Sequence, residues 1–278
     1  ADANTNSLFG LTVDGTLVLG TSTSNGNGTG NGSTFTVSST GTLKVGGATN
    51  FPSNYNTISL AAGSTVEYNG TGQTVSTRTY SNLLFTGTSA TTAGSFTVGQ
   101  NLSIADGATL NVANGLTVTG TTTVGAGTSG ILNITSATGD KTFTGLLTVN
   151  AGGTWNNSSN DAVTINSGLT NDGQFTAGSG TLTLAGTVTN TGTFSTTNTS
   201  ATPVPSTINW GGTFVYAATG GGQTIVDGVG SYNNLTLLNS SGTNTAVGNL
   251  TINNSLTTTA GGTLNMVAHS LGGSLTTV

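Results

Sequence analysis

The stretch from Phe96 to Gly115, FTVGQNLSIADGATLNVANG, shows the pattern that repeats along the chain. It holds a short strand-like run, a turn, a second run and a turn that carries glycine. Within each run apolar and polar residues alternate, as expected of a strand with one buried and one exposed face. Similar units of about 18 to 21 residues recur at 163–180, 181–198 and 250–270, a length that fits one coil of a β-solenoid.

The composition also favours strands and turns. The 278 residues include 45 glycines and only 4% charged residues. Thr and Val favour strands, Gly and Asn favour turns, and the strong helix formers Glu, Lys, Arg and Gln are scarce. A disordered linker would not keep evenly spaced Leu, Val, Ile and Phe. We therefore predict an all-β chain that forms a single elongated β-solenoid, expected as a right-handed β-helix. About 19 residues per coil give about 14 coils.

A longer repeat overlies the coils. The motifs GSTVEY, QTV, YSNLLF, NLSI and GATLN occur in order between residues 63 and 111. They recur in the same order as GGTFVY, QTI, YNNLTLL, NLTI and GGTLN between residues 211 and 265. We predict an internal duplication of residues 63–124 and 211–274, with Tyr80 and Tyr232 in equivalent positions.

The beginning of the chain departs from this pattern. Residues 21–34, TSTSNGNGTGNGST, include no apolar residue and are typical of a flexible linker or loop. They separate the apolar stretch 8–19, LFGLTVDGTLVL, from the rest. We predict residues 1–20 as a separate strand segment and candidate donor strand, residues 21–34 as the linker, and residues 35–278 as the solenoid.

Both ends are predicted to take part in assembly. A solenoid ends in open strand ladders that template further pairing, and solenoids that stay monomeric normally carry a cap. Here the sequence 264–278, LNMVAHSLGGSLTTV, still follows the coil pattern. A chain cut from a longer repeat protein would have the same open ends, and this alternative stays open. The candidate assembly residues are Leu8, Phe9, Leu11, Val13, Leu17 and Leu19 at one end and Leu271, Leu275 and Val278 at the other.

Charge and composition exclude several classes of partner. Three Lys and Arg residues against eight Asp and Glu residues give a net charge of −5. Without a basic surface, nucleic acid is not an expected partner. No apolar stretch approaches the roughly 18 residues of a membrane helix, so membrane insertion is not expected. The absence of cysteine fits a cytosolic or a surface protein, and the scarcity of lysine favours an extracellular or cell-surface location.

No catalytic, cofactor or metal site is predicted. The string GAGTSG at 125–130 matches a dinucleotide fingerprint, but the strand formers that follow it stand where phosphate binding needs a helix N-terminus. The one histidine, His269, has no clustered carboxylates or cysteines beside it. Lys44 and Glu67 are expected to form a surface ion pair between adjacent coils, and Arg78 is the one arginine. We expect that the protein is not an enzyme.

One family resemblance accompanies these patterns. It rests on Thr65–Val66, Tyr68, Gln73–Val75, Tyr80 and Asn82–Leu83, followed by coils of the LTV type. This block resembles the β-helical repeat regions of bacterial surface proteins, namely autotransporter passengers and filamentous-haemagglutinin-like adhesins. The resemblance covers about residues 35–278. It implies a β-helix outside the cell and brings no catalytic residue with it.

Three functions fit these observations. The first is a structural subunit of an extracellular filament, with copies of the same chain joined head to tail through strand pairing. The second is a surface adhesin or carbohydrate-binding rod, with glycans or host and cell surfaces as partners. Trp155, Trp210, Tyr68 and Tyr216 would line its sugar-binding stripe, although core positions are more usual for such residues. The third is ice binding through ranks of threonine such as residues 119–123 and 181–183.

Overall fold

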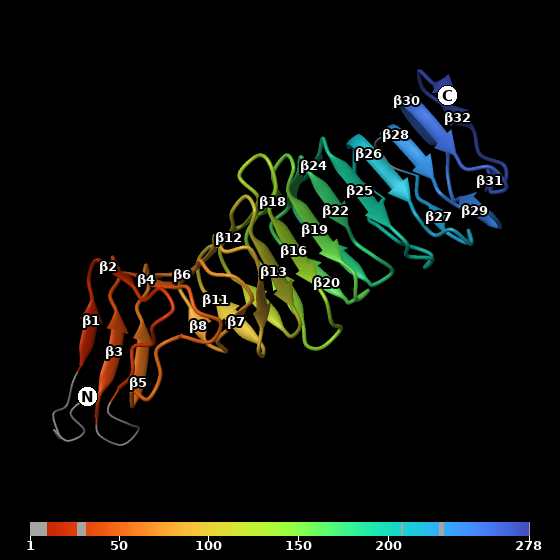
Figure 1. Ribbon diagram of the computed structural model, residues 1–278. Helices are drawn as coiled ribbons and strands as arrows, with labels where there is room; N and C mark the ends of the chain where they lie inside the picture. The colour runs from red at the N-terminus through yellow and green to blue at the C-terminus, as the bar shows by residue number, and fades with distance from the viewer. Residues whose placement is uncertain (1–9, 27–31, 207, 228–230, 278) are drawn as a thin grey trace.

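The structure is a computed structural model that describes residues 10–26, 32–206, 208–227 and 231–277. Neighbouring strands are parallel and stack into a β-solenoid of about 12 turns. No helix occurs within the described ranges. The rod places its first and last described coils, those of β1 (Leu11–Val13) and β32 (Leu271–Gly272), at opposite ends of the molecule (Figure 1). The predicted fold class is confirmed.

Five parallel sheets run along the rod. A sheet near the N-terminus contains β1 (Leu11–Val13), β3 (Thr34–Val37) and β5 (Thr57–Leu60). A nine-stranded sheet contains β2 (Thr16–Val18), β4 (Thr42–Val45), β6 (Thr65–Tyr68), β9 (Asn82–Phe85), β12 (Leu102–Ile104), β15 (Thr122–Val124), β18 (Leu147–Val149), β21 (Leu169–Asn171) and β24 (Val188–Asn190). A six-stranded sheet contains β8 (Thr79–Tyr80), β11 (Phe96–Val98), β14 (Leu116–Val118), β17 (Lys141–Phe143), β20 (Val163–Ile165) and β23 (Leu182–Leu184).

The remaining two sheets reach the C-terminal end. The twelve-stranded sheet contains β7 (Gln73–Val75), β10 (Ala90–Thr92), β13 (Thr109–Val112), β16 (Ile131–Ile134), β19 (Thr154–Asn157), β22 (Gln174–Thr176), β25 (Thr193–Thr196), β26 (Trp210–Tyr216), β28 (Tyr232–Leu237), β30 (Leu250–Thr258), β32 (Leu271–Gly272) and β33 (Thr276–Thr277). A sheet beside it contains β27 (Thr224–Ile225), β29 (Thr243–Ala246) and β31 (Thr263–Asn265). Each central coil contributes one strand to each of three sheets, as β10, β11 and β12 do.

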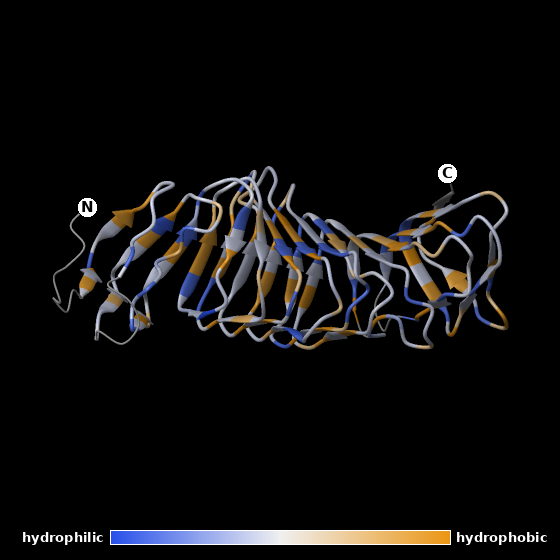
Figure 2. Ribbon diagram, turned by 60° about the horizontal axis from the view of Figure 1, so that its bottom comes forward, coloured by the Kyte–Doolittle hydropathy of each residue, from blue (hydrophilic) through white to orange (hydrophobic). Residues whose placement is uncertain are grey.

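The strands form because the sequence alternates at the period of a pleated strand. In β14, for example, Leu116 and Val118 are buried while Thr117 between them lies outward. Figure 2 shows such hydrophobic positions recurring on strands along the whole rod. Corners between strands often require glycine. Gly152 has a φ of 75°, and a Cβ added there would lie 2.4 Å from the carbonyl oxygen of Thr128 in the coil before.

Aromatic side chains form a column on the core-facing side of the twelve-stranded sheet. Trp155, Phe175, Phe194 and Phe214 follow one another in register on four adjacent strands. Their ring centroids are 4.2, 5.0 and 5.2 Å apart in that order. Trp155 lies in this column, and Trp210, Tyr68 and Tyr216 are also buried. The interpretation favoured from the sequence, that these four aromatic residues are core residues, is confirmed, and the alternative of a sugar-binding stripe is wrong.

The coils are longer on average than the sequence suggested. Residues hydrogen-bonded across adjacent coils are 17 apart between Thr71 and Thr88 but 25 apart between Gly125 and Asn150. These insertions occur at corners, where extra residues leave the strand register intact. The chain therefore forms about 12 turns rather than the 14 expected.

Residues 11–18 are not a separate segment, which corrects the prediction for this part of residues 1–20, whereas residues 1–9 lie outside the described residues. β1 pairs with β3, and β2 pairs with β4, so residues 11–18 form the first coil of the solenoid. The beginning of the predicted linker is also tied to the rod. The side-chain amide of Asn50 donates to the carbonyl oxygens of Gly20 and Ser22, and Asn25 forms a bridge with Ser53. Residues 27–31 lie outside the described residues.

Candidate functional site

The first coil presents an open strand edge. Within the described residues, β1 has β3 as its one partner and β2 has β4 as its one partner. Leu11 is exposed, Val13 is buried, and Leu17 and Leu19 are partly buried against the core. Leu8 and Phe9, which the sequence also suggested, lie outside the described residues. The outer edge of this coil therefore combines apolar side chains with backbone groups that have no strand partner among the described residues.

The last coil presents a second open edge. β32 and β33 both pair with β30, and no further strand follows within the described residues. Leu271 is exposed, while Leu275 is partly buried against the core. Val278 lies outside the described residues. Because this coil lies at the opposite end of the rod from β1 and β2 (Figure 1), the two groups of residues can meet only between different molecules.

Two exposed apolar residues at these ends were missed by the sequence analysis. Val18 in β2 is 60% exposed, and Val267 in the turn after β31 is 66% exposed. Val267 also has a φ of 52°, which is rare for a β-branched residue. Alternation along β2 could have pointed to Val18, since it stands next to the inward-facing Leu17. No sequence signal marks Val267.

The glycine-rich string at 125–130 binds a carboxylate of its own chain. One oxygen of Asp106 accepts hydrogen bonds from the backbone amides of Ala126, Ser129 and Thr128 at 2.7, 3.1 and 3.3 Å. These bonds lower the pKa of Asp106 to about 2, and the bond from the amide of Ala126 has the largest effect. β16 follows the string directly. The loop is thus an anion-binding concavity that an aspartate of the preceding coil already fills.

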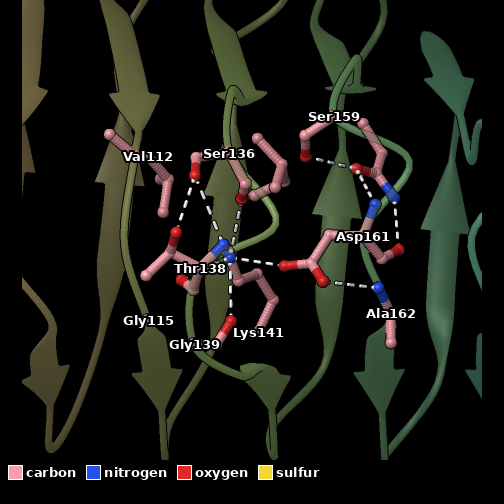
Figure 3. A network of polar contacts seen from close by, with 12 residues as sticks. Val112, Gly115, Ser136, Thr138, Gly139, Lys141, Ser159, Asp161 and Ala162 are labelled. Atoms are coloured by element: carbon pink, nitrogen blue, oxygen red, sulfur yellow. Dashed lines mark hydrogen bonds and ion pairs between the residues drawn. The ribbon is translucent and has the colours of Figure 1, made fainter.

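A lysine with no exposed side-chain surface lies between two coils. The ammonium of Lys141 donates to the carbonyl oxygens of Ser136, Thr138 and Gly139 at 2.9, 3.0 and 2.8 Å. Its fourth contact is an ion pair with Asp161 (Figure 3). All donors of the ammonium are used, so Lys141 is a structural cation and has no free position for chemistry.

The remaining charged and titratable candidates also lie apart from any cluster. Lys44 forms an ion pair with Glu67 at 2.7 Å, as the sequence suggested, and its side chain is 34% exposed. His269 is half-buried after the turn that follows β31, and its backbone amide donates to Met266. In the part of the chain that the structure describes, no three His, Cys, Asp or Glu side chains gather as metal ligands.

The two motif blocks of the sequence make the same contacts. The hydroxyls of Tyr68 and Tyr80 lie 3.0 Å apart, and those of Tyr216 and Tyr232 also lie 3.0 Å apart. Tyr68 and Tyr216 each accept a backbone amide, from residues 76 and 226. Tyr80 and Tyr232 each donate to the carbonyl oxygen of that same residue. Tyr68 lies on the nine-stranded sheet and Tyr80 on the six-stranded sheet, whereas Tyr216 and Tyr232 both lie on the twelve-stranded sheet. The local hydrogen-bond network is therefore the same, while the sheets that carry it differ.

Burial changes the acidity of these tyrosines. Desolvation raises the pKa of Tyr216 to about 12 and the pKa values of Tyr80 and Tyr232 well above 10. It also raises the pKa of Tyr68. A folded-state pKa above the unfolded value means that the folded state holds its proton longer. The stabilisation is therefore complete below pH 10 and is lost as the pH rises through the folded-state values.

We expect alkaline unfolding that is coupled to tyrosine ionisation. The free energy of unfolding should stay constant with respect to these groups below pH 10 and should fall steadily above it. Far-UV circular dichroism and tyrosinate absorbance, followed together in one pH titration, measure this coupling. Full tyrosinate absorbance at pH 10 with an intact strand signal would contradict the coupling.

Comparison with protein-family models, with curated proteins and with solved structures finds no match to this chain. Within the described residues, no helix has the length and apolar character needed to cross a membrane.

Proposed function

We propose that this chain is a structural rod of an extracellular or cell-surface filament, in which copies stack head to tail through their end coils. The observation that carries the proposal is the pair of parallel strand edges, at opposite ends of the rod, that have no partner among the described residues. Parallel strands can continue across such a junction in the register that they have within one molecule. Both edges also have exposed apolar side chains, Leu11 and Val18 at one end and Val267 and Leu271 at the other.

The interior of the rod supports a mechanical role. Strand ladders and the aromatic column run along the rod axis, so each coil is held by hydrogen bonds and packing to its neighbours. The low charge and absence of cysteine fit an extracellular material whose stability comes from these ladders. Such stacking does not require β1 and β2 to detach from β3 and β4. These strands can stay paired within their own molecule on one side and pair with a neighbouring molecule on the other.

Charges placed on the first coil test this proposal. The wild-type chain is expected to form linear particles as its concentration rises, and the double variant Leu11→Lys/Val18→Lys is expected to remain monomeric. Lysine on an edge strand opposes pairing with another strand. Analytical ultracentrifugation and negative-stain microscopy measure the particle size and shape.

A matched variant keeps the added charge but moves it. Ile131 and Leu146 are exposed apolar residues of the central coils, so Ile131→Lys/Leu146→Lys should assemble as the wild type does. Equal assembly of the end variant and the wild type would contradict the proposal. A wild-type chain that stays monomeric at high concentration would contradict it as well.

A further inference from the structure

The chain has three cationic side chains, and two of them are paired with carboxylates. Lys44 pairs with Glu67, and Lys141 pairs with Asp161. The third, Arg78, forms no ion pair with any described residue. In a chain with eight acidic residues and a net charge of −5, an arginine left without a carboxylate is unusual. A guanidinium offers five donors, and its affinity is highest for a planar carboxylate that accepts two of them.

Arg78 is held in place by stacking rather than by hydrogen bonds. Its guanidinium lies over the ring of Phe51, 5.0 Å from the ring centroid. Its Nε is buried and has no hydrogen-bond partner among the described residues. A buried polar nitrogen without a partner costs free energy, so hydrogen bonding within the described residues does not explain why an arginine stands here.

The tyrosine cluster beside Arg78 does not require this cation. The second motif block keeps the same pair of tyrosine hydroxyls, yet the segment between Val226 and Tyr232 includes no lysine or arginine. The repeated network therefore forms with or without a neighbouring guanidinium. Arg78 is an addition to the first block, and it calls for an explanation other than packing of the cluster.

Arg78 lines an open polar groove on the six-stranded sheet. The groove has a volume of about 430 Å³ and crosses four successive coils. Hydroxyl side chains line much of it, and the exposed carboxylate of Asp140 belongs to its last coil. The lining residues are Thr77, Arg78, Thr79, Ser95, Phe96, Thr97, Gly115, Leu116, Thr117, Gly139 and Asp140. A second groove of about 300 Å³, which includes Phe51, shares Thr77 and Arg78 with it.

We propose that this groove binds an acidic saccharide, with the carboxylate of a uronic or sialic acid residue on Arg78. The guanidinium supplies the bidentate contact that a carboxylate prefers. Threonine and serine hydroxyls can donate to and accept from sugar hydroxyls, and Asp140 can accept from a hydroxyl further along the chain. An extended ligand with several negative charges, such as a nucleic acid, would be repelled by Asp140 and by the net charge of the protein.

This site goes beyond the proposed structural role, because it gives the rod a ligand on its side rather than at its ends. Binding and stacking are independent in this arrangement: Arg78 and Asp140 lie in coils away from β1, β2, β32 and β33. The charge variants at Leu11 and Val18 should therefore leave saccharide binding unchanged, and the two proposals can fail separately.

Isothermal titration with defined oligosaccharides tests the site. We expect 3′-sialyllactose, which carries a single carboxylate, to bind and its neutral counterpart lactose not to bind. Arg78→Gln should lower the affinity at least tenfold, and Arg78→Lys should lower it by less, since a lysine keeps the charge but loses the paired donors. Asp140→Asn changes an exposed side chain and should alter the affinity without affecting the fold.

The matched control is Lys44→Gln, which removes the same charge from a cation that already has a partner. It should bind as the wild type does, and each variant is compared with the wild type by thermal unfolding. An equal loss of affinity in Lys44→Gln and Arg78→Gln would overturn the proposal, because it would indicate attraction by overall charge. Failure to bind any saccharide on an array of uronate, sialate, sulfated and neutral chains would also overturn it. So would binding confined to sulfated chains, or stronger binding of a polyglutamate peptide.

Discussion

Replacing Lys141 by methionine is expected to destabilise the protein by about 3–5 kcal/mol, the usual cost of removing one partner of a buried ion pair. Methionine keeps much of the side-chain volume, so the loss comes from polar groups and not from a cavity. The carbonyl oxygens of Ser136, Thr138 and Gly139 would lose their donor, and the carboxylate of Asp161 would lose its cation.

The chain contains its own control for this substitution. Lys44 also pairs with a carboxylate of the next coil, but its side chain is 34% exposed whereas that of Lys141 is fully buried. Lys44→Met should therefore cost less than Lys141→Met, because Lys44 is partly solvated and the carboxylate of Glu67, although it is largely buried, still accepts from the hydroxyl of Thr86. Denaturant unfolding of both variants measures the difference. Equal losses of stability in the two variants would show that Lys141 is solvated in the folded protein and would contradict its structural role.

Asp161→Asn gives an intermediate case. The other carboxylate oxygen of Asp161 accepts from the backbone amide of Ala162 at 2.8 Å. An asparagine oxygen can still accept from Lys141 or from that amide, and the three carbonyl oxygens still surround the ammonium. We expect a loss of stability smaller than that of Lys141→Met, because fewer groups lose their partners.

The sequence pattern predicts the strands but not every inward residue. Alternation in Leu116–Val118 shows directly which side chains are buried. In the next coil Lys141 and Phe143 take the same two positions, paired in register with Leu116 and Val118. The position was visible in the sequence, since KTF follows the spacing of LTV. A lysine at an inward position needs local acceptors, and those come from a corner whose conformation no periodicity specifies.

The ends of the rod also separate features that the sequence pattern predicts from features that it does not. The apolar pattern led to Leu11, Val13 and Leu271 as assembly candidates, but it did not distinguish the exposed Leu11 and Leu271 from the buried Val13. A run without apolar residues led to a linker at 21–34, yet Asn50 holds the beginning of that run against the rod through two backbone carbonyls. Hydrogen bonds from one amide to residues about 30 positions earlier leave no mark in composition or periodicity.

The Arg78 groove depends on register between coils. Arg78 and Asp140 are 62 positions apart in the sequence and come to one groove only because successive corners stack. Coil lengths vary between neighbouring turns, so counting residues cannot align these corners. The pairing of each strand with the next decides which side chains share the groove.

Replacing Phe194 by alanine is expected to cost about 3–5 kcal/mol, the range for truncating a buried phenylalanine. The Phe194 ring is fully buried, and it lies 5.0 Å from Phe175, 5.2 Å from Phe214 and 4.7 Å from Trp210. Its removal breaks the column in the middle, so contacts are lost on both sides along the axis. Because each coil of a solenoid is held mainly by its neighbours, the surrounding coils have little other packing with which to compensate.

Two further substitutions separate ring stacking from simple burial. Phe194→Leu keeps an apolar side chain in the column and should cost about 1 kcal/mol, within the range for size-conserving core changes. Val215→Ala removes apolar atoms from the outward side of β26, next to the column, and should change stability by no more than about 0.5 kcal/mol. Unfolding by guanidinium chloride, followed by circular dichroism and by tryptophan fluorescence, reports the loss in the whole rod and near Trp155 and Trp210. If Phe194→Ala destabilised the rod no more than Val215→Ala does, the aromatic column would not be what holds adjacent coils together.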